Sequence, residues 1–356
     1  RAASAILGRL YLNVVVATAR NKKRSSDDGD REEIQVSGLY IHPVKSFRPV
    51  SLDEAQLDER GFIHDRRFML IVPLPKSHFA KHEPTHRFLS QRQCPSLATI
   101  VATITPGDGP KLKLECERLV EKQYNNKSIV IDMESATADN RQYLVSLWDD
   151  VVQVVDMGNP VAAFCQAIVN QDTEMPEEMK SGVRLVVQAP TDSRNTNPTY
   201  TPTSAHSLWG VRPSVGLTDG FPILLANQAS LDELNRRLMD KGKSPIEMSR
   251  FRPNIVVSGS AKPFDEDYWK IIEIDGVLFH IVKGCPRCKQ SCTDQHTGKV
   301  HEEPLETMAE FRATTAVKED VYFAQNVIPA QGSAGRNMRV GARVKVIQRG
   351  PPVWET

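Results

Sequence analysis

The amino-acid sequence predicts a mainly β protein of the α+β class, built around a barrel-like β domain with a few added helices. Many short apolar segments of strand length are separated by turn residues, as in barrels and sandwiches. Few segments have helical spacing of apolar residues, which argues against a doubly wound fold. The sequence contains no internal repeat, no P-loop and no glycine-rich dinucleotide fingerprint.

Alternating or continuous apolar runs predict the strands of the first half. A helix should follow, with Asn159 as its cap, Pro160 in its first turn and an apolar face along residues 161–168. Cys165 lies on that face, so we expect it to be a core residue. The expected strands are residues 34–41, 68–72, 97–104, 111–114, 128–131 and 151–155.

The second half resumes after a long polar loop over residues 188–215. Ser230 and Glu233 have the spacing of a capping box, which predicts a helix that carries Leu231, Leu234 and Leu238. Asp275-Gly276 between two apolar runs predicts a β-hairpin. A short helix is expected over 305–311 and strands at 221–225, 254–258, 271–274, 277–281 and 340–347.

The length of 356 residues is enough for two domains, and we place them at 34–178 and 179–350. Residues 1–33 form a basic leader followed by an acidic linker. The chain begins with Arg1 rather than Met, so we expect a disordered leader, a truncated membrane anchor or a transit segment.

The near-neutral charge of +1 gives no reason to expect nucleic-acid binding. Six cysteines are too few for a disulfide scaffold, which indicates a reducing compartment.

A cluster of thiols is the sharpest chemical feature. Cys285, Cys288, Cys292 and His296 have ligand-like spacing, although four ligands within twelve residues make a cramped tetrahedron. A structural zinc site, one working thiolate and inert cysteines all remain open at this point. Two cations, Arg287 and Lys289, flank Cys288 directly. Neighbouring cations lower the pKa of a thiol, so they would favour a thiolate at Cys288.

Basic residues recur at the ends of predicted strands. Lys45-Ser46 can bind an anion, or can belong to an ordinary surface loop. One of Arg66 and Arg67 should point inward, where an arginine needs an anionic partner. Arg252 precedes a proline, which predicts an extended backbone, and arginine suits phosphate recognition. These sites and a thiolate cluster suit a large anionic cofactor bound to a soft metal.

Together these motifs resemble the MOSC family, in particular its amidoxime-reducing and related bacterial branch. The resemblance covers residues 34–348. It rests on His-Pro-Val-Lys-Ser (42–46), Asp-Arg-Arg-Phe-Met-Leu (65–70), Leu-Ser-Gln-Arg-Gln (89–93), Phe-Arg-Pro-Asn-Ile-Val-Val (251–257), Cys-Pro-Arg-Cys (285–288), Asp-Gln-His-Thr-Gly (294–298), Glu-Pro-Leu-Glu-Thr (303–307) and Arg-Val-Gly-Ala-Arg-Val (339–344).

The resemblance implies a MOSC β-barrel domain preceded by a β-rich MOSC-associated domain, and a molybdenum cofactor. It assigns Cys288 as the protein ligand to molybdenum and Asp219 as a candidate proton donor. The residues that it assigns to cofactor binding are Lys45, Ser46, Arg67, Asp219, Gly220, Phe221, Arg252, Asn254, Pro286, Arg287 and Asn326.

The sequence departs from the family pattern at several positions, among them Asp219-Gly220-Phe221, which lacks the hydroxyls that some relatives have there. Pro286 stands where a serine is common, which removes a hydroxyl and a backbone N–H. Cys292 and His296 lie outside the pattern, and the resemblance makes zinc a minor alternative because the family fills this site with molybdenum.

The implied activity is reduction of N-hydroxylated substrates, namely amidoximes and hydroxylamines, by oxygen-atom removal. The sequence has no flavin or haem signature, so the resemblance implies electrons from cytochrome b5 and its NADH-dependent reductase. It also implies a mitochondrial location, with outer-membrane attachment through the N-terminus as one form and a cytoplasmic protein as the alternative. Two other functions remain: a sulfur carrier or cofactor-binding protein without reductase activity, and a zinc-stabilised β scaffold.

Overall fold

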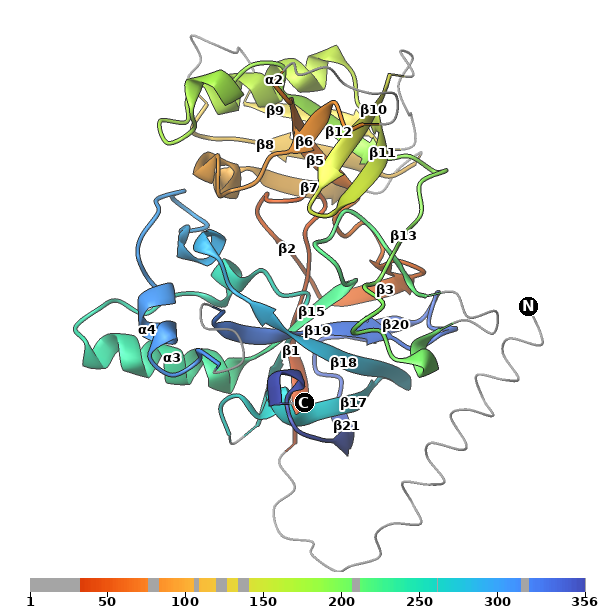
Figure 1. Ribbon diagram of the computed structural model, residues 1–356, viewed down its shortest axis with the longest axis vertical. Helices are drawn as coiled ribbons and strands as arrows, with labels where there is room; N and C mark the ends of the chain where they lie inside the picture. Colours follow the sequence, from red (N-terminus) through yellow and green to blue (C-terminus); the bar gives the residue numbers. More distant parts are fainter. Residues whose placement is uncertain are drawn as a thin grey trace, which may run out of the picture.

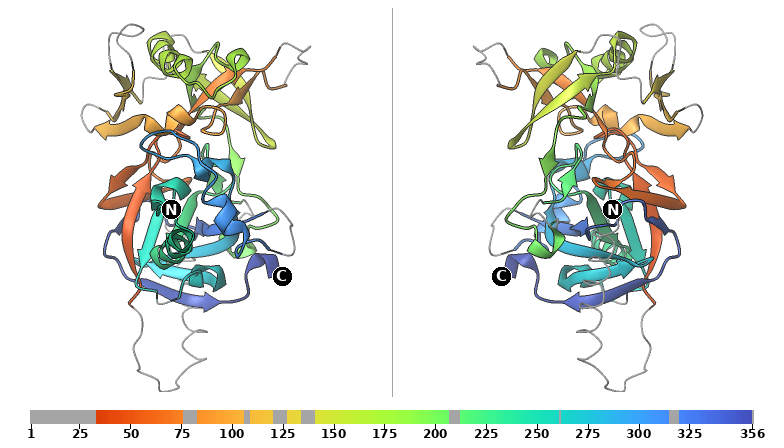
Figure 2. Two further views of the ribbon diagram at one scale, coloured as in Figure 1. Left: turned by 90° about the vertical axis from the view of Figure 1, so that its left-hand side faces the viewer. Right: turned by 90° about the vertical axis from the view of Figure 1, so that its right-hand side faces the viewer.

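The computed structural model describes residues 33–75, 83–105, 109–119, 127–133, 141–206, 212–260, 262–314 and 320–355. Figure 1 shows two strand-rich parts stacked along the long axis, and the side views in Figure 2 show the same stacking. The expected leader lies outside the described residues except for Glu33. Among the described residues, no helix combines the length and apolar character needed to cross a membrane.

The lower part in Figure 1 is an eight-stranded sheet with the strand order β2-β1-β16-β15-β19-β18-β17-β21. β15 and β16 are parallel, and the other neighbours are antiparallel. The strands are β1 (Gln35–Ile41), β2 (Val50–Leu52), β15 (Ile223–Asn227), β16 (Ile255–Ser258), β17 (Trp269–Ile274), β18 (Val277–Pro286), β19 (Tyr322–Pro329) and β21 (Val344–Arg349).

Both faces of this sheet are buried against apolar side chains. Successive residues of a strand point to opposite faces, so Leu225 belongs to the core that contains Trp269, whereas Leu224 belongs to the core on the other face. Helices α3 (Gln228–Asp240) and α4 (Leu305–Ala309) contribute apolar side chains to that second core. The sheet is therefore a rigid base for the loops at its edges.

The upper part is a five-stranded closed barrel with the strand order β10-β11-β12-β5-β6. Alternate residues such as Met69 and Ile71 fill its interior, while Leu70 packs outside with α2 (Asn159–Asn170). The strands are β5 (Phe68–Pro73), β6 (His86–Phe88), β10 (Gln142–Leu147), β11 (Asp150–Asp156) and β12 (Arg184–Gln188). A three-stranded sheet flanks it, formed by β7 (Val101–Thr105), β8 (Lys111–Glu115) and β9 (Ser128–Asp132).

The remaining elements are short. Two small sheets are formed by β3 (Glu54–Asp58), β4 (Gly61–Phe62) and β20 (Asn337–Arg339), and by β13 (Arg194–Asn195) and β14 (Ser214–Val215). The 3-10 helices are η1 (Pro95–Thr99), η2 (Glu177–Met179), η3 (Thr203–Ala205), η4 (Met248–Phe251), η5 (Asp265–Tyr268), η6 (Lys289–Cys292) and η7 (Val353–Glu355).

Strand pairing crosses the domain boundary that we placed at residue 178. β12 lies after that boundary, yet it completes the barrel by pairing with β5 and β11. β1 lies well before the boundary, yet it pairs with β16 in the eight-stranded sheet. The barrel is thus inserted between strands of the sheet, and the limits 34–178 and 179–350 stay a prediction.

The mainly β class is confirmed, and so is the hairpin at Asp275-Gly276, where Ile274 pairs with Val277. Both turn residues have positive φ, 48° and 73°, as a two-residue hairpin turn requires. The strand expected over 97–104 is wrong in its first part. Pro95 opens the 3-10 helix η1 there, and β7 begins only at Val101.

Both predicted helix caps are wrong. α2 has Gly158 at its N-cap, and the Asn159 side chain instead accepts a hydrogen bond from Arg184. α3 is capped by Asn227, whose side chain accepts from the backbone N–H of Ala229. Ser230 donates to the buried Glu266 carboxylate instead of capping the helix. In both cases the helix begins earlier than the apolar pattern indicates. Cys165 is fully buried, as expected.

Candidate active site

A pocket lies between the barrel and the central strands β15, β19 and β18 of the eight-stranded sheet, and residues from both parts line it. Six of the lining side chains are cationic, and Asp219 is the single carboxylate among them. Such a lining favours an anionic ligand. The lining residues are Lys45, Ser46, Arg66, Phe88, Ser90, Arg92, Trp148, Thr218, Asp219, Gly220, Phe221, Ile223, Leu224, Arg250, Phe251, Arg252, Asn254, Cys285, Pro286, Arg287, Cys288, Gln290, Ser291 and Asn326.

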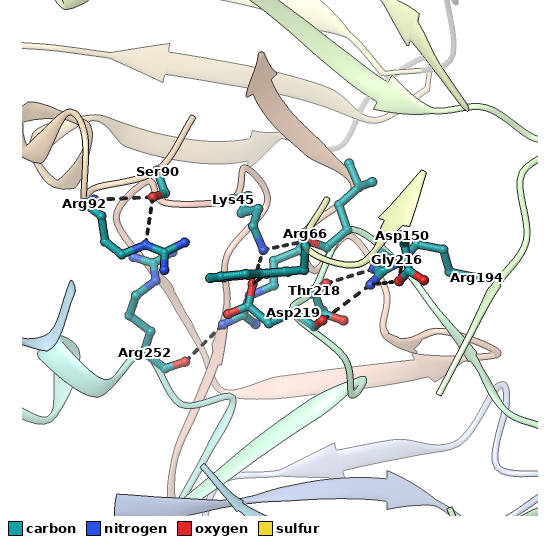
Figure 3. A network of polar contacts seen from close by, with 12 residues as sticks. Lys45, Arg66, Ser90, Arg92, Asp150, Arg194, Gly216, Thr218, Asp219 and Arg252 are labelled. Atoms are coloured by element: carbon teal, nitrogen blue, oxygen red, sulfur yellow. Dashed lines mark hydrogen bonds and ion pairs between the residues drawn. The ribbon is translucent and has the colours of Figure 1, made fainter. Parts of the chain in front are cut away.

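Lys45 and Asp219 form an ion pair inside this pocket (Figure 3). Lys45 follows β1 in a turn that hydrogen-bonds to β5, since its backbone N–H donates to the Phe68 carbonyl. Its Nζ donates to the carbonyl of Leu217 at 3.0 Å and to Asp219 Oδ1 at 2.5 Å. Burial of the ammonium lowers the pKa of Lys45 from 10.5, and the Asp219 carboxylate opposes that effect.

The charge state of Asp219 follows from the same contacts. Removing the carboxyl from water would raise its pKa, but the Lys45 ammonium, the hydrogen bond from Lys45 and the Trp148 indole outweigh this and lower the pKa. Its side chain is 69% exposed toward the open pocket, which weakens these effects without reversing their direction. Asp219 is therefore a carboxylate at neutral pH, and the proton of the pair is on Lys45.

Arg252 is a buried residue of the pocket lining, and part of its guanidinium is unpaired. Its Nη1 donates to the Phe47 carbonyl at 2.7 Å and to Gln295 Oε1 at 3.2 Å, whereas its buried Nη2 has no partner. Burial, and then repulsion from Arg66, lower the pKa of Arg252 to about 9. A buried guanidinium with a free N–H group and no carboxylate partner fits an anion such as a phosphate.

The backbone at Arg252 differs from the extended form that we expected before a proline. Its φ is 57°, in the left-handed region, because it ends the 3-10 helix η4 and donates its N–H to the Ser249 carbonyl. Arg66 also binds the Arg252 carbonyl at 3.1 Å. These local hydrogen bonds overcome the preference that Pro253 imposes.

Arg66 lines the pocket, whereas Arg67, to which the resemblance assigned cofactor binding, does not. Both arginines precede β5, so strand alternation does not decide their directions. Arg66 donates to Asp65 at 2.6 Å and to Asn254 Oδ1 at 3.1 Å. Arg67 forms an ion pair with Asp58 of β3.

β18 leads directly into the cysteine segment. Cys288 is exposed and lines the pocket. The Arg287 guanidinium donates to Cys285 Sγ at 2.8 Å and to the Phe251 carbonyl at 2.6 Å. The arginine that we expected beside Cys288 is therefore hydrogen-bonded to the other thiol.

The four residues of the zinc alternative do not converge. Cys292 is buried and donates to the Glu302 carbonyl, while His296 pairs at the surface with Glu247 at 2.9 Å. Within the described ranges, no three His, Cys, Asp or Glu side chains form a group that could hold a metal ion. The spacing along the chain is therefore not matched by a tetrahedral arrangement.

Apart from Arg67, every residue that the sequence assigned to the site lines this one pocket. Asn254 is also a structural crosslink, because it accepts from Leu224 N–H and Arg66 and donates to the Tyr40 carbonyl. Asn326 lies on β19, opposite Leu224.

Sequence reasoning missed Phe88, Arg92 and Trp148, which reach the pocket from the barrel. Arg92 lies in the Leu-Ser-Gln-Arg-Gln block that carries part of the resemblance, so a signal existed for it. For Trp148 no pattern in the sequence indicates a site, because only the folded barrel brings the hairpin tip to the pocket.

Comparison with known proteins identifies two families along the chain. The MOSC domain matches residues 212–353, and the MOSC N-terminal beta barrel domain matches residues 33–172. The solved YuaD protein of Bacillus subtilis is 9% identical and covers 88% of this chain and 95% of its own, with a TM-score of 0.29, which is too low to support an argument.

Curated relatives fall into two groups. Mitochondrial amidoxime-reducing component 1 of Danio rerio is 30% identical over 78% of this chain and 75% of that protein. Mitochondrial amidoxime reducing component 2 of Rattus norvegicus is 30% identical over 78% of this chain and 72% of that protein. Molybdenum cofactor sulfurase of Solanum lycopersicum is 26% identical over 78% of this chain but 31% of that protein, so the chain spans about a third of that relative's length.

Two MOSC families match successive parts of the sequence, and the match extends over most of the length of the amidoxime-reducing relatives. The chain therefore belongs to the MOSC-domain family of molybdenum-cofactor-related proteins, alongside the mitochondrial amidoxime-reducing components.

Proposed function

We propose that this protein binds the molybdenum cofactor in the pocket and reduces N-hydroxylated compounds, such as amidoximes and hydroxylamines, to the corresponding amidines and amines. The observation that carries the proposal is one pocket that contains both an exposed thiol, Cys288, and a buried guanidinium with an unpaired N–H group, Arg252. A soft thiolate ligand and a phosphate clamp are what a metal held by a phosphorylated organic ligand needs.

The lining residues fit that cofactor in charge and in chemical type. Arg252 and Arg66 would hold the phosphate, and the Ser46 hydroxyl could add a hydrogen bond to it. Cys288 would be the metal ligand, since its thiol is exposed to the pocket whereas Cys285 is hydrogen-bonded to Arg287. When bound, the cofactor supplies the two-electron chemistry of oxygen-atom removal.

The protein's own contribution to the reaction is proton supply and orientation. Loss of the oxygen as water takes up two protons, and Lys45 Nζ is a protonated group inside the pocket. The Asp219 carboxylate accepts a hydrogen bond from that ammonium and so fixes its direction. In this arrangement Lys45 holds the proton that we first assigned to Asp219, and Asp219 orients it.

Electrons must come from another protein in this proposal, and the family resemblance suggests cytochrome b5 with an NADH-dependent reductase. The names of the amidoxime-reducing relatives support a mitochondrial location. The rival function is a cofactor-binding or sulfur-carrying protein without reductase activity, because molybdenum cofactor sulfurases are also among the relatives.

One experiment separates the two functions. The protein is expressed with molybdate, purified, and analysed for molybdenum, zinc and labile persulfide. Benzamidoxime reduction is then measured with a chemical electron donor. We expect about one molybdenum per chain and turnover to benzamidine. Zinc without molybdenum would overturn the cofactor assignment, and a labile persulfide without turnover would favour the carrier.

Within the site, Arg66→Ala and Arg67→Ala form a matched pair of variants. Arg66 lines the pocket, whereas Arg67 pairs with Asp58 outside it. We expect Arg66→Ala to lose cofactor and Arg67→Ala to retain it. The reverse result would contradict the assignment of the phosphate clamp.

A further inference from the structure

Trp148 lies at the tip of the β10–β11 hairpin, where the barrel reaches over the pocket. Leu147 pairs with Asp150, so Trp148 begins a two-residue turn. Its side chain is 44% exposed although it is a large apolar group, and it is one of the residues that line the pocket. The barrel therefore places an accessible aromatic ring at a site whose other lining groups are mostly cationic or polar.

The backbone at Trp148 is strained for its residue type. Its φ is 58°, in the left-handed region, where the first position of a hairpin turn normally has glycine. Bulky residues occupy this region only when their surroundings hold them there, and such positions concentrate at sites of ligand contact. The positive φ of Trp148 and the exposure of its ring are separate observations. Both indicate that this position contacts a ligand.

Three pocket residues hold the ring in one orientation. The indole Nε1 donates to Asp219 Oδ1 at 2.9 Å. The Arg92 guanidinium lies over the ring, with Cζ 4.2 Å from its centroid, and the Phe88 ring centroid is 5.4 Å away at a tilt of 52°. An aromatic group fixed on several sides loses little conformational entropy when a ligand stacks on its accessible part.

A second contact fixes the hairpin relative to the pocket loop (Figure 3). Arg194 is buried and pairs with Asp150, two residues after Trp148, at 2.7 Å. The same guanidinium donates to the carbonyls of Gly216 at 2.7 Å and Thr218 at 2.9 Å, in the segment that leads to Asp219. The tryptophan and the Lys45–Asp219 pair are therefore held at a set separation.

We propose that Trp148 determines the substrate class by stacking, so that the pocket prefers flat, conjugated N-hydroxylated compounds, such as aryl amidoximes, to aliphatic ones. The inference rests on the proposed reductase function. The N-hydroxyl end of such a substrate would lie toward Cys288 and Asp219, with its aryl ring against the indole. An aliphatic amidoxime has the same reacting group but no ring to stack.

The test compares benzamidoxime with acetamidoxime in the cofactor-loaded protein and in its Trp148→Gly and Trp148→Phe variants. Glycine suits the positive φ, so Trp148→Gly should fold, and melting temperature checks this. Val151→Ala is the matched control, because Val151 is 49% exposed on the same hairpin but does not line the pocket. Intrinsic fluorescence quenching by benzamidine measures stacking without turnover.

We expect Trp148→Gly to raise KM for benzamidoxime about 3- to 10-fold relative to KM for acetamidoxime, the range of an aromatic stacking contact. The variant also loses the hydrogen bond from the indole to Asp219, but that loss affects both substrates alike and cancels in the ratio. Trp148→Phe should keep most of the preference, and Val151→Ala should match the wild type. The quenching by benzamidine should disappear in Trp148→Gly.

Equal changes for both substrates, or none for either, would overturn the stacking proposal while the reductase function stands. If neither the wild type nor any variant reduces either compound, the proposed reductase function is wrong. The benzamidine quenching titration then tests the stacking proposal by itself. Quenching that persists unchanged in Trp148→Gly would count against Trp148 as the contact.

Discussion

Replacing Arg252 tests whether its guanidinium recognises the phosphate of the cofactor. The fall of its pKa from 12.5 to about 9 corresponds to about 5 kcal/mol of unfavourable free energy for the charged form in this buried place. A bound phosphate would offset much of that cost. Truncation of one partner of a buried charge pair costs about 2–5 kcal/mol, so we expect Arg252→Ala to weaken cofactor binding roughly 30- to 4,000-fold.

The assay is the molybdenum and pterin content of purified protein, followed by the affinity of the emptied protein for added cofactor. Arg252→Lys should recover only part of the affinity, because an ammonium cannot donate two parallel hydrogen bonds. Arg48→Ala is the control, since Arg48 also donates to the Gln295 segment but does not line the pocket. Full retention in Arg252→Ala would refute the reasoning, as would an equal loss in Arg48→Ala.

Three further predictions concern other residues. Cys288→Ser should abolish reduction while the protein keeps most of its cofactor. Cys292 lies outside the pocket, so Cys292→Ser should change activity only slightly. Equal losses of activity and melting temperature in the two variants would reject Cys288 as the metal ligand. Burial lowers the pKa of Lys45 from 10.5, so turnover should fall as the pH rises, at a pH below that value. If Lys45→Met showed the same fall of turnover at high pH, Lys45 would not be its origin. Burial and the neighbouring Asp267 raise the pKa of Glu266 above 4.5, so the folded state binds the extra proton and stability is lost as pH rises above that value. The melting temperature of Glu266→Gln minus that of the wild type should therefore increase from pH 5 to pH 8. A difference that stays constant over this range would contradict the prediction.

The residues of the pocket could be predicted where chemistry and position along a strand coincide. Lys45, Arg252 and Cys288 each follow or precede an apolar run that becomes a strand or a buried turn, so their motifs could be read from the sequence. Arg66 and Arg67 could not be separated, because the choice depends on which of the two meets Asn254 and which meets Asp58 across the fold.

Individual strands and helix boundaries were harder to predict than the fold class. β19 and most of the short strands carry too few residues or too little alternation to be recognised locally, and their pairing with distant strands defines them. The helix caps failed for a related reason, since Ser230 finds a stronger partner in Glu266, which lies in another element. Trp148 gives no local signal because glycine, the usual mark of its turn, is absent.

The insertion of the barrel between strands of the sheet has a consequence for biosynthesis. β1 emerges from the ribosome early but must wait for β16, and β3 must wait for β20 near the C-terminus. The barrel strands β5 to β12 are complete long before either partner exists. Because the pocket draws on both parts, the nascent chain has no place to receive a cofactor. Loading therefore requires that synthesis has passed Asn326, the last residue of the pocket lining, and the edge of β1 that β16 covers stays unpaired until β16 has been made.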